Sequence, residues 1–345
     1  RLAGSKYSLV DYNRAGIALC EIVSKPDIRS GKEASEYASE IRRTVRYLGV
    51  SDGNMQEGSL RCDVNISVRK GPNAPFGTKV EIKNMNSFSA IQKACDYEIA
   101  RQIEVYENGG KIFQETRLWD EAKQLTKSMR LKEGSSDYRY FPDPDLGPIE
   151  ITKAQQEIWF KELPELPSKK RNKYVSQFGL SAYDARVISD EISMANFFEE
   201  TVANGAEAKL ASNWVTSDIV GYLKSNKLSF SELKLSPENL AEMINMISKN
   251  IISGKIAKEI LPELIQKNIS PKKLVEEKGL AMISDSSSIL PIIDELINEH
   301  PNEVQAFKNG KTKLLGFFVG QLMKRTKGKA DPKLANKLLM EKLNS

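Results

Sequence analysis

The stretch Leu60-Arg61-Cys62-Asp63-Val64-Asn65-Ile66-Ser67-Val68-Arg69 alternates strictly between apolar and polar residues. A period of two is typical of a β-strand with one buried face. After a loop over residues 71–77, the alternation returns over residues 78–83. Consecutive strands joined by a short loop favour an antiparallel pair. The apolar side chains would then face one core. Five charged residues would share the opposite face: Arg61, Asp63, Lys79, Glu81 and Lys83.

Helical patterns flank these strands. Ser30 and Glu33 fit a capping box, in which Glu33 reaches back, and the stripe that follows ends at Gly49. A second helix should end at Gly109-Gly110. Its inward face is expected to consist of Phe88, Ile91, Cys95, Ile99, Ile103 and Tyr106. Further strand-like runs lie between about residues 111 and 152, so the first part is predicted to be an α+β arrangement of a sheet with helices on one side.

The remainder of the chain reads as helices. The segment Leu163-Pro164-Glu165-Leu166-Pro167 is a predicted linker, and strand patterns disappear after it. A length of 345 residues favours two or three domains. No apolar run is long enough for a membrane span. Gly316 and Gly320 lie four residues apart on a predicted helix, which indicates close packing against another helix.

Composition excludes several classes of site. The three cysteines are far apart without CxxC spacing, which argues against a disulfide scaffold or a zinc knuckle. His300 is the single histidine, so the sequence provides almost none of the residues needed for a Cys-His or Ser-His-Asp nucleophile. Residues 311–345 hold nine Lys/Arg against two acidic residues. The net charge is +5, so the rest of the chain sums to −2, and the basic tail is predicted to touch a polyanion.

The charged face of the two strands allows two interpretations. Carboxylates and cations on rigid strands suit Mg²⁺ and phosphate, because Mg²⁺ needs only one or two carboxylates besides substrate phosphates. The face can equally be a solvated surface with weak cross-strand ion pairs. No Walker A or GxGxxG motif supports nucleotide binding. The run Lys324-Arg325-Thr326-Lys327-Gly328-Lys329 is similarly open to two interpretations, a solvated face or RNA backbone contact.

Several segments closely resemble the B subunits of tRNA-dependent amidotransferases, in the same order along essentially the whole chain. They include Leu9-Val10-Asp11-Tyr12-Asn13-Arg14-Ala15-Gly16, Glu21-Ile22-Val23-Ser24-Lys25-Pro26-Asp27, Gln56-Glu57-Gly58-Ser59-Leu60-Arg61-Cys62-Asp63-Val64-Asn65, Lys79-Val80-Glu81-Ile82-Lys83-Asn84-Met85-Asn86-Ser87, Gln114-Glu115-Thr116-Arg117, residues 137–145 and Gly316-Phe317-Phe318-Val319-Gly320-Gln321-Leu322-Met323-Lys324.

The resemblance implies a kinase-type cradle of the glutamine-synthetase kind over residues 1–165. A helical domain would follow over residues 166–270, and a small YqeY-like tail that binds tRNA over residues 271–345. It also implies a ligase that uses ATP and Mg²⁺ to phosphorylate the side-chain carboxylate of Glu-tRNA(Gln), Asp-tRNA(Asn) or both. Ammonia from the partner amidase, the A subunit of these enzymes, then displaces phosphate. The assembly would be a heterotrimer completed by the small C subunit.

Carried over by position, the resemblance implies metal ligands, catalytic residues, ATP contacts and tRNA contacts. The metal ligands would be Glu21, Asp63 and Glu57. The catalytic residues would be Asp63, Glu81, Lys83 and Arg61. The ATP contacts would be Arg61, Lys79 and Lys83. The tRNA contacts would be Lys324, Arg325, Lys327 and Lys329.

The family normally has a segment ahead of residue 1 that supplies further acidic and histidine ligands, and we expect this chain to lack it. A non-catalytic tRNA-binding or assembly module is therefore the alternative. An unrelated nucleotide-binding enzyme is a third interpretation. The resemblance implies a bacterial cytoplasm, with an organelle matrix as the other option.

Overall fold

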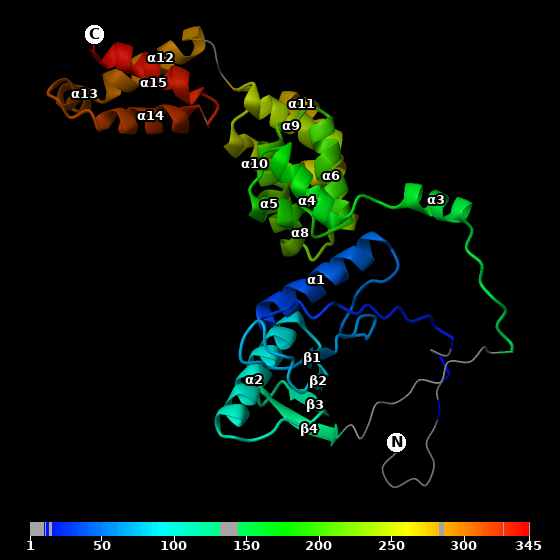
Figure 1. The fold of residues 1–345 in the computed structure, drawn as a ribbon. Coiled ribbons are helices and arrows are strands. Elements are labelled where there is room, and N and C mark those ends of the chain that lie inside the picture. The colour runs from blue at the N-terminus through cyan, green and yellow to red at the C-terminus, as the bar shows by residue number, and fades with distance from the viewer. Residues whose placement is uncertain are drawn as a thin grey trace. The chain divides into compact units, whose positions relative to one another are not determined.

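The computed structural model describes residues 10, 12–13, 16–131, 144–282, 286–326 and 328–344. The chain forms two compact units (Figure 1). The first comprises Arg1–Arg42 and Asp52–Gly147, and the second comprises Arg43–Ser51 and Pro148–Ser345. The predicted order of a mixed α+β part followed by helices is confirmed for the described residues. None of their helices is both long and apolar enough to span a membrane.

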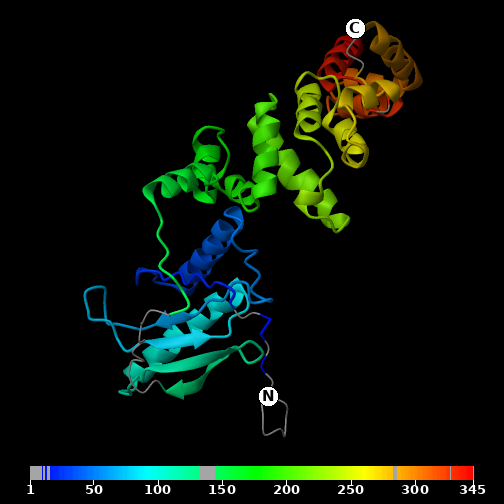
Figure 2. The ribbon, with the colours of Figure 1, turned by 90° about the vertical axis from the view of Figure 1, so that its right-hand side faces the viewer.

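The first unit is built on a four-stranded sheet in the order β1-β2-β3-β4 (Figure 2). Its strands are β1 (Val64–Ile66), β2 (Val80–Lys83), β3 (Glu115–Asp120) and β4 (Leu125–Leu131). β1 and β2 pair antiparallel, as the alternation predicts, although β1 is shorter than the ten-residue pattern. β2 and β3 pair parallel, and β3 and β4 antiparallel. A parallel pair needs a crossover, which is α2 (Phe88–Glu107).

The strand register separates two faces of the sheet. Val64 lies opposite Ile82, and Ile66 opposite Val80, so their side chains share one face. This face packs on α2 through Ile91. The whole core cluster consists of Ala34, Ala38, Ile66, Ile82, Met85, Ala90, Ile91, Ala94, Cys95 and Trp119.

Helix α1 (Gly31–Tyr47) begins and ends near the predicted positions. The Glu33 amide donates to Ser30 Oγ at 3.2 Å, but the Glu33 carboxylate accepts from the Arg29 amide at 2.6 Å rather than from Ser30. A side chain at Gly31 would collide with the Gln92 carbonyl at 2.5 Å, so glycine lets α1 start against α2. Gly49 follows the helix at φ 67°, a left-handed conformation that glycine adopts without strain.

The inward face of α2 differs from the predicted stripe in its second half. Ile103 and Tyr106 are exposed, whereas Glu98 and Gln102 are fully buried. Glu98 accepts hydrogen bonds from Arg101 Nη2 at 2.6 Å and Thr126 Oγ1 at 2.9 Å. Gln102 Nε2 also donates to it at 3.0 Å, and Arg117 Nε lies 3.6 Å away. A polar network therefore replaces apolar contact where α2 meets β3 and β4.

The second unit consists of helices in the described residues and contains two separate apolar clusters. Its first elements are α3 (Lys153–Glu162), α4 (Pro167–Ser176), α5 (Ala182–Ile188), α6 (Ile192–Ala203), α7 (Ala208–Asn213), the π-helical η1 (Trp214–Ile219), α8 (Val220–Ser225) and the 3₁₀ turn η2 (Phe230–Glu232). They are followed by α9 (Pro237–Ser248), α10 (Gly254–Lys267), α11 (Pro271–Glu277), α12 (Ser286–Glu299), α13 (Pro301–Lys308), α14 (Leu314–Arg325) and α15 (Pro332–Asn344). One cluster joins α4 to α11 and the other joins α12 to α15.

The two glycines of α14 do not lie at a contact between helices. Gly316 and Gly320 lie on the exposed face of α14, and a side chain at either would meet nothing within 4 Å. The prediction that they permit close helix packing is therefore wrong.

The end of α1 belongs to the second unit, where Tyr47 Oη donates to the Ser189 carbonyl at 3.0 Å.

We predict that Glu98→Gln lowers the stability of the first unit by about 2 kcal/mol, because it removes a fully buried carboxylate that accepts hydrogen bonds from Arg101, Gln102 and Thr126. Hydrogen exchange of the β3 and β4 amides measures this loss locally. Glu104→Gln is the matched control, since Glu104 is exposed on the same helix. Equal protection in the two variants would contradict a stabilising role for Glu98.

Candidate active site on the open face of the sheet

The face of the sheet opposite α2 carries a cluster of charges. Glu81 lies across from Asn65 on β1 and beside Thr116 on β3. Strand alternation places Asp63 and Lys83 on the same face. The Lys83 ammonium forms a short hydrogen bond with Asp63 and lies 3.4 Å from Glu81 Oε1. The structure thus brings together three of the predicted site residues.

The surroundings keep Lys83 charged. Its hydrogen bond to Asp63 raises the pKa of Lys83 above its ordinary value; burial opposes this, and the charges of Asp63 and Glu81 add to it. Asp63 is about half exposed, whereas the side chain of Glu81 is only 15% exposed. A cation held between two carboxylates on a rigid sheet offers both metal ligands and a contact for phosphate.

The other predicted residues lie outside this cluster. Arg61 and Lys79 are exposed and lie beyond the ends of β1 and β2. Glu21 is exposed in a stretch without secondary structure, and Glu57 is exposed in a turn. In the described part of the chain, no three His, Cys, Asp or Glu residues are grouped so that they could hold a metal ion. Asp63 and Glu81 are therefore the carboxylates that the fold gathers, and two suffice for Mg²⁺ bound with substrate phosphates.

Known proteins match the whole length of the chain. Residues 1–157 match the model of the GatB/GatE catalytic domain, and residues 196–343 match that of the GatB domain. The chain is 99% identical over 345 residues to the B subunit of the aspartyl/glutamyl-tRNA(Asn/Gln) amidotransferase of Prochlorococcus marinus strain AS9601. It is 95% identical to that of strain MIT 9312. Both alignments cover 100% of this chain and 70% of the relative. The corresponding B subunit of Synechococcus sp. strain CC9605 is 70% identical over 99% of the chain and 69% of its own length.

The chain belongs to the family of amidotransferase B subunits. The catalytic-domain match includes the open face of the sheet with Asp63, Glu81 and Lys83. The second match includes the whole cluster of α12 to α15 and most of the cluster of α4 to α11.

The basic tail of this family member is only partly open to a ligand. Lys324 is exposed. Arg325 instead lies 3.1 Å from Glu295 and forms a short ion pair with Glu299, both on α12. Lys329 Nζ donates to the Gly279 carbonyl at 2.6 Å. Lys327 lies outside the described residues.

A second group of exposed lysines lies in the tail, outside the predicted contacts at residues 324–329. Lys308, Lys311 and Lys313 are all exposed around the turn between α13 and α14. Their signal was present in the run Lys308-Asn309-Gly310-Lys311-Thr312-Lys313, which holds three lysines in six residues.

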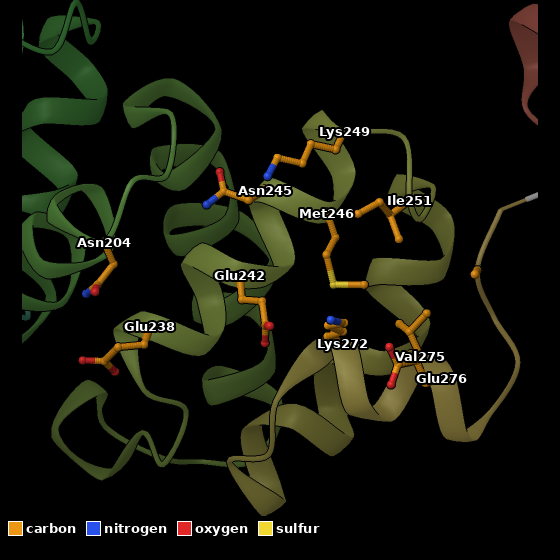
Figure 3. Close-up of a pocket in the computed structure, with 11 residues that line it drawn as sticks. Asn204, Glu238, Glu242, Asn245, Met246, Lys249, Ile251, Lys272, Val275 and Glu276 are labelled. Atoms are coloured by element: carbon orange, nitrogen blue, oxygen red, sulfur yellow. The ribbon is translucent and has the colours of Figure 1, made fainter. Parts of the chain in front are cut away.

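A groove of about 510 Å³ in the helical unit is lined by both apolar and charged side chains (Figure 3). Met246 and Val275 contribute apolar surface to it. Its charged lining residues are Glu238, Glu242, Lys249, Lys272 and Glu276. Glu242 accepts a hydrogen bond from Ser270 Oγ at 2.8 Å. Three carboxylates against two ammonium groups disfavour a polyphosphate, so this groove is a poor candidate for the nucleotide site.

The thiols next to the site are unsuited to nucleophilic attack. Burial, together with the neighbouring charge of Asp63, raises the pKa of Cys62 to about 11. Burial raises the pKa of Cys95 to about 12. Cys20, in contrast, is exposed. A thiol reacts as its thiolate, so the two core cysteines are almost entirely unreactive at neutral pH.

We therefore predict that an aromatic disulfide reagent at pH 8 modifies one thiol rapidly in the folded chain. Cys20→Ser should remove this fast phase, while Cys62 and Cys95 react only after denaturation. Absorbance of the released thiolate follows each phase. A fast thiol in the Cys20→Ser variant would show that the core cysteines are accessible.

Proposed function

We propose that this chain performs the ATP-dependent activation step of tRNA-dependent amidation, as part of a ligase. The side-chain carboxylate of glutamate on tRNA(Gln), or aspartate on tRNA(Asn), attacks the γ-phosphorus of ATP, and ADP leaves. Ammonia then displaces phosphate and gives the amide. The observation that carries this proposal is the cluster of Asp63, Glu81 and Lys83 on the sheet within the matched catalytic domain.

The carboxylates and the ammonium group of the cluster would have different roles. Asp63 and Glu81 would hold Mg²⁺, which supplies neutralisation of phosphate charge when bound. The Lys83 ammonium would contact a phosphate oxygen and stabilise the charge that develops during transfer. Arg61 and Lys79, which are exposed beyond the strand ends, would approach the nucleotide from the rim. Glu21 and Glu57 remain proposed additional ligands.

Ammonia is expected from another subunit, because a single histidine provides almost none of the residues needed for a Cys-His or Ser-His-Asp nucleophile. We assign its release to the partner amidase (the A subunit), with which this chain would assemble together with the small C subunit. Residues 1–165 would form the cradle with the activation site, residues 166–270 a helical domain, and residues 271–345 the tRNA-binding tail. The bacterial origin of the relatives supports a cytoplasmic location.

We predict that Asp63→Asn in the assembled amidotransferase lowers tRNA-dependent ATP hydrolysis at least 100-fold and leaves tRNA affinity within about twofold, because it removes an anionic ligand while preserving shape. Asp120→Asn is the matched control. Asp120 projects from the same face of the sheet and pairs with Lys127 at 2.5 Å. Turnover by Asp63→Asn equal to that of the control at limiting Mg²⁺ would remove Asp63 from the site.

A second candidate function follows from the exposed lysines of the tail. A non-catalytic tRNA-binding or assembly module is this second candidate, because the exposed lysines Lys308, Lys311, Lys313 and Lys324 could contact an RNA backbone without any nucleotide. Titration of Mg²⁺–ATP onto the chain, followed by calorimetry, separates the two functions. Binding that Asp63→Asn abolishes supports activation, whereas tRNA binding without nucleotide binding supports the module.

The tail yields a separate prediction. Lys324→Glu should weaken tRNA binding several-fold and lower the salt dependence of log Kd by about 1, because an exposed lysine can neutralise a phosphate. Arg325→Gln should instead change the salt slope little, because Arg325 is already paired with Glu295 and Glu299, and it should lower the melting temperature of the tail only slightly, because these pairs are exposed. Filter binding over a salt series and circular dichroism give the two readouts. Equal salt slopes for Lys324→Glu and wild type would exclude this surface from tRNA binding.

A further inference from the structure

A buried hydroxyl is directed at the candidate site. Thr116 on β3 is fully buried, and its Oγ1 donates to Glu81 Oε2 at 2.8 Å. The parallel pairing of β2 and β3 places the two residues side by side. A buried hydroxyl is costly unless it finds a partner, and a carboxylate is a strong one.

The two oxygens of Glu81 are held by different donors. Oε2 accepts from Thr116, while Oε1 lies 3.4 Å from the Lys83 ammonium. A long, flexible carboxylate side chain is therefore fixed in one orientation at a half-enclosed position. Asp63 differs, because it is about half exposed and its Oδ2 contacts the lysine alone.

The backbone that carries Thr116 is fixed from the opposite face. Its neighbour Glu115 accepts from Arg117 Nη1 at 2.6 Å, and Arg117 Nη2 donates to the Thr126 carbonyl at 2.9 Å. The pairing with β4 shifts register between Thr116 and Arg117. Such irregularities re-aim side chains near active sites. Here both residues that flank Thr116 are anchored on the α2 side, which leaves its hydroxyl directed at Glu81.

We propose that Thr116 is a positioning residue that orients the Glu81 carboxylate toward Mg²⁺–ATP. This inference rests on the proposed function. Thr116 acts through Glu81 and touches neither the metal nor the nucleotide. Groups that orient metal ligands typically change metal affinity by about 10- to 100-fold when they are removed.

The test compares Thr116→Val and Thr116→Ser in the assembled amidotransferase. Valine keeps the shape of threonine without its hydroxyl, whereas serine keeps the hydroxyl. We expect Thr116→Val to weaken Mn²⁺ binding in the presence of ATP about 10-fold, measured by electron paramagnetic resonance, and Thr116→Ser to restore it to within about threefold. Hydrogen-exchange protection of the β3 amides should remain equal in both variants.

A double-mutant cycle separates positioning from packing. If Thr116 acts through Glu81, Thr116→Val adds nothing in a Glu81→Gln background, because the oriented carboxylate is already gone. An additive loss, or weaker binding that follows lost β3 protection, overturns the inference in favour of a packing role. If Thr116→Val binds Mn²⁺ as tightly as wild type while Asp63→Asn abolishes binding, the inference about Thr116 is overturned and the proposed function stands. Unchanged binding in Asp63→Asn and Glu81→Gln overturns the proposed function itself.

Discussion

The buried carboxylate of Glu98 is the interaction on which the candidate site depends. An ionised carboxylate cannot remain in the interior without charged and hydrogen-bonding partners, and Glu98 obtains them from Arg101, Gln102 and Thr126. The hydrogen bond from Thr126 joins α2 to β4, whereas Arg101 and Gln102 hold the carboxylate from within α2 itself. Although burial opposes it, hydrogen bonds from Ser128 and Arg117 hold the pKa of Glu115 below its ordinary value, so Glu115 stays ionised in the same network. The part of β3 that carries Thr116 is thus positioned by charged side chains on the opposite face of the sheet.

The sequence could predict the parts of the site that follow from local alternation. Asp63, Glu81 and Lys83 share a face because a strand turns successive side chains to opposite sides, and the short loop between the strands makes their antiparallel pairing the natural arrangement. The contact between Thr116 and Glu81 could not be predicted in this way. It depends on the parallel register of strands separated by a whole helix, and no local pattern specifies that register.

Local counts of charged and apolar residues do not show which partners a side chain meets in the fold. Arg325 belongs to the basic run, yet Glu295 and Glu299 on α12 engage it, while Lys324 beside it is exposed. The predicted apolar stripe on α2 is wrong in its second half, because Glu98 is buried whereas Ile103 and Tyr106 are exposed. A buried acid breaks the apolar pattern that identifies a helix face, so a polar network inside a core cannot be recognised from the sequence alone.

The different burial of the two carboxylates has a consequence for the proposed activation step. The pair between Asp63 and Lys83 is partly exposed to water, where such pairs contribute little free energy. Under the proposed function, a phosphate oxygen would therefore replace Asp63 at the Lys83 ammonium at little cost in free energy, and Asp63 would become available to the metal. Glu81 is held by the buried Thr116 hydroxyl and keeps its orientation throughout the exchange. One adjustable and one fixed carboxylate would then allow Mg²⁺–ATP to bind without rearrangement of the sheet, because only the half-exposed side chain would have to move.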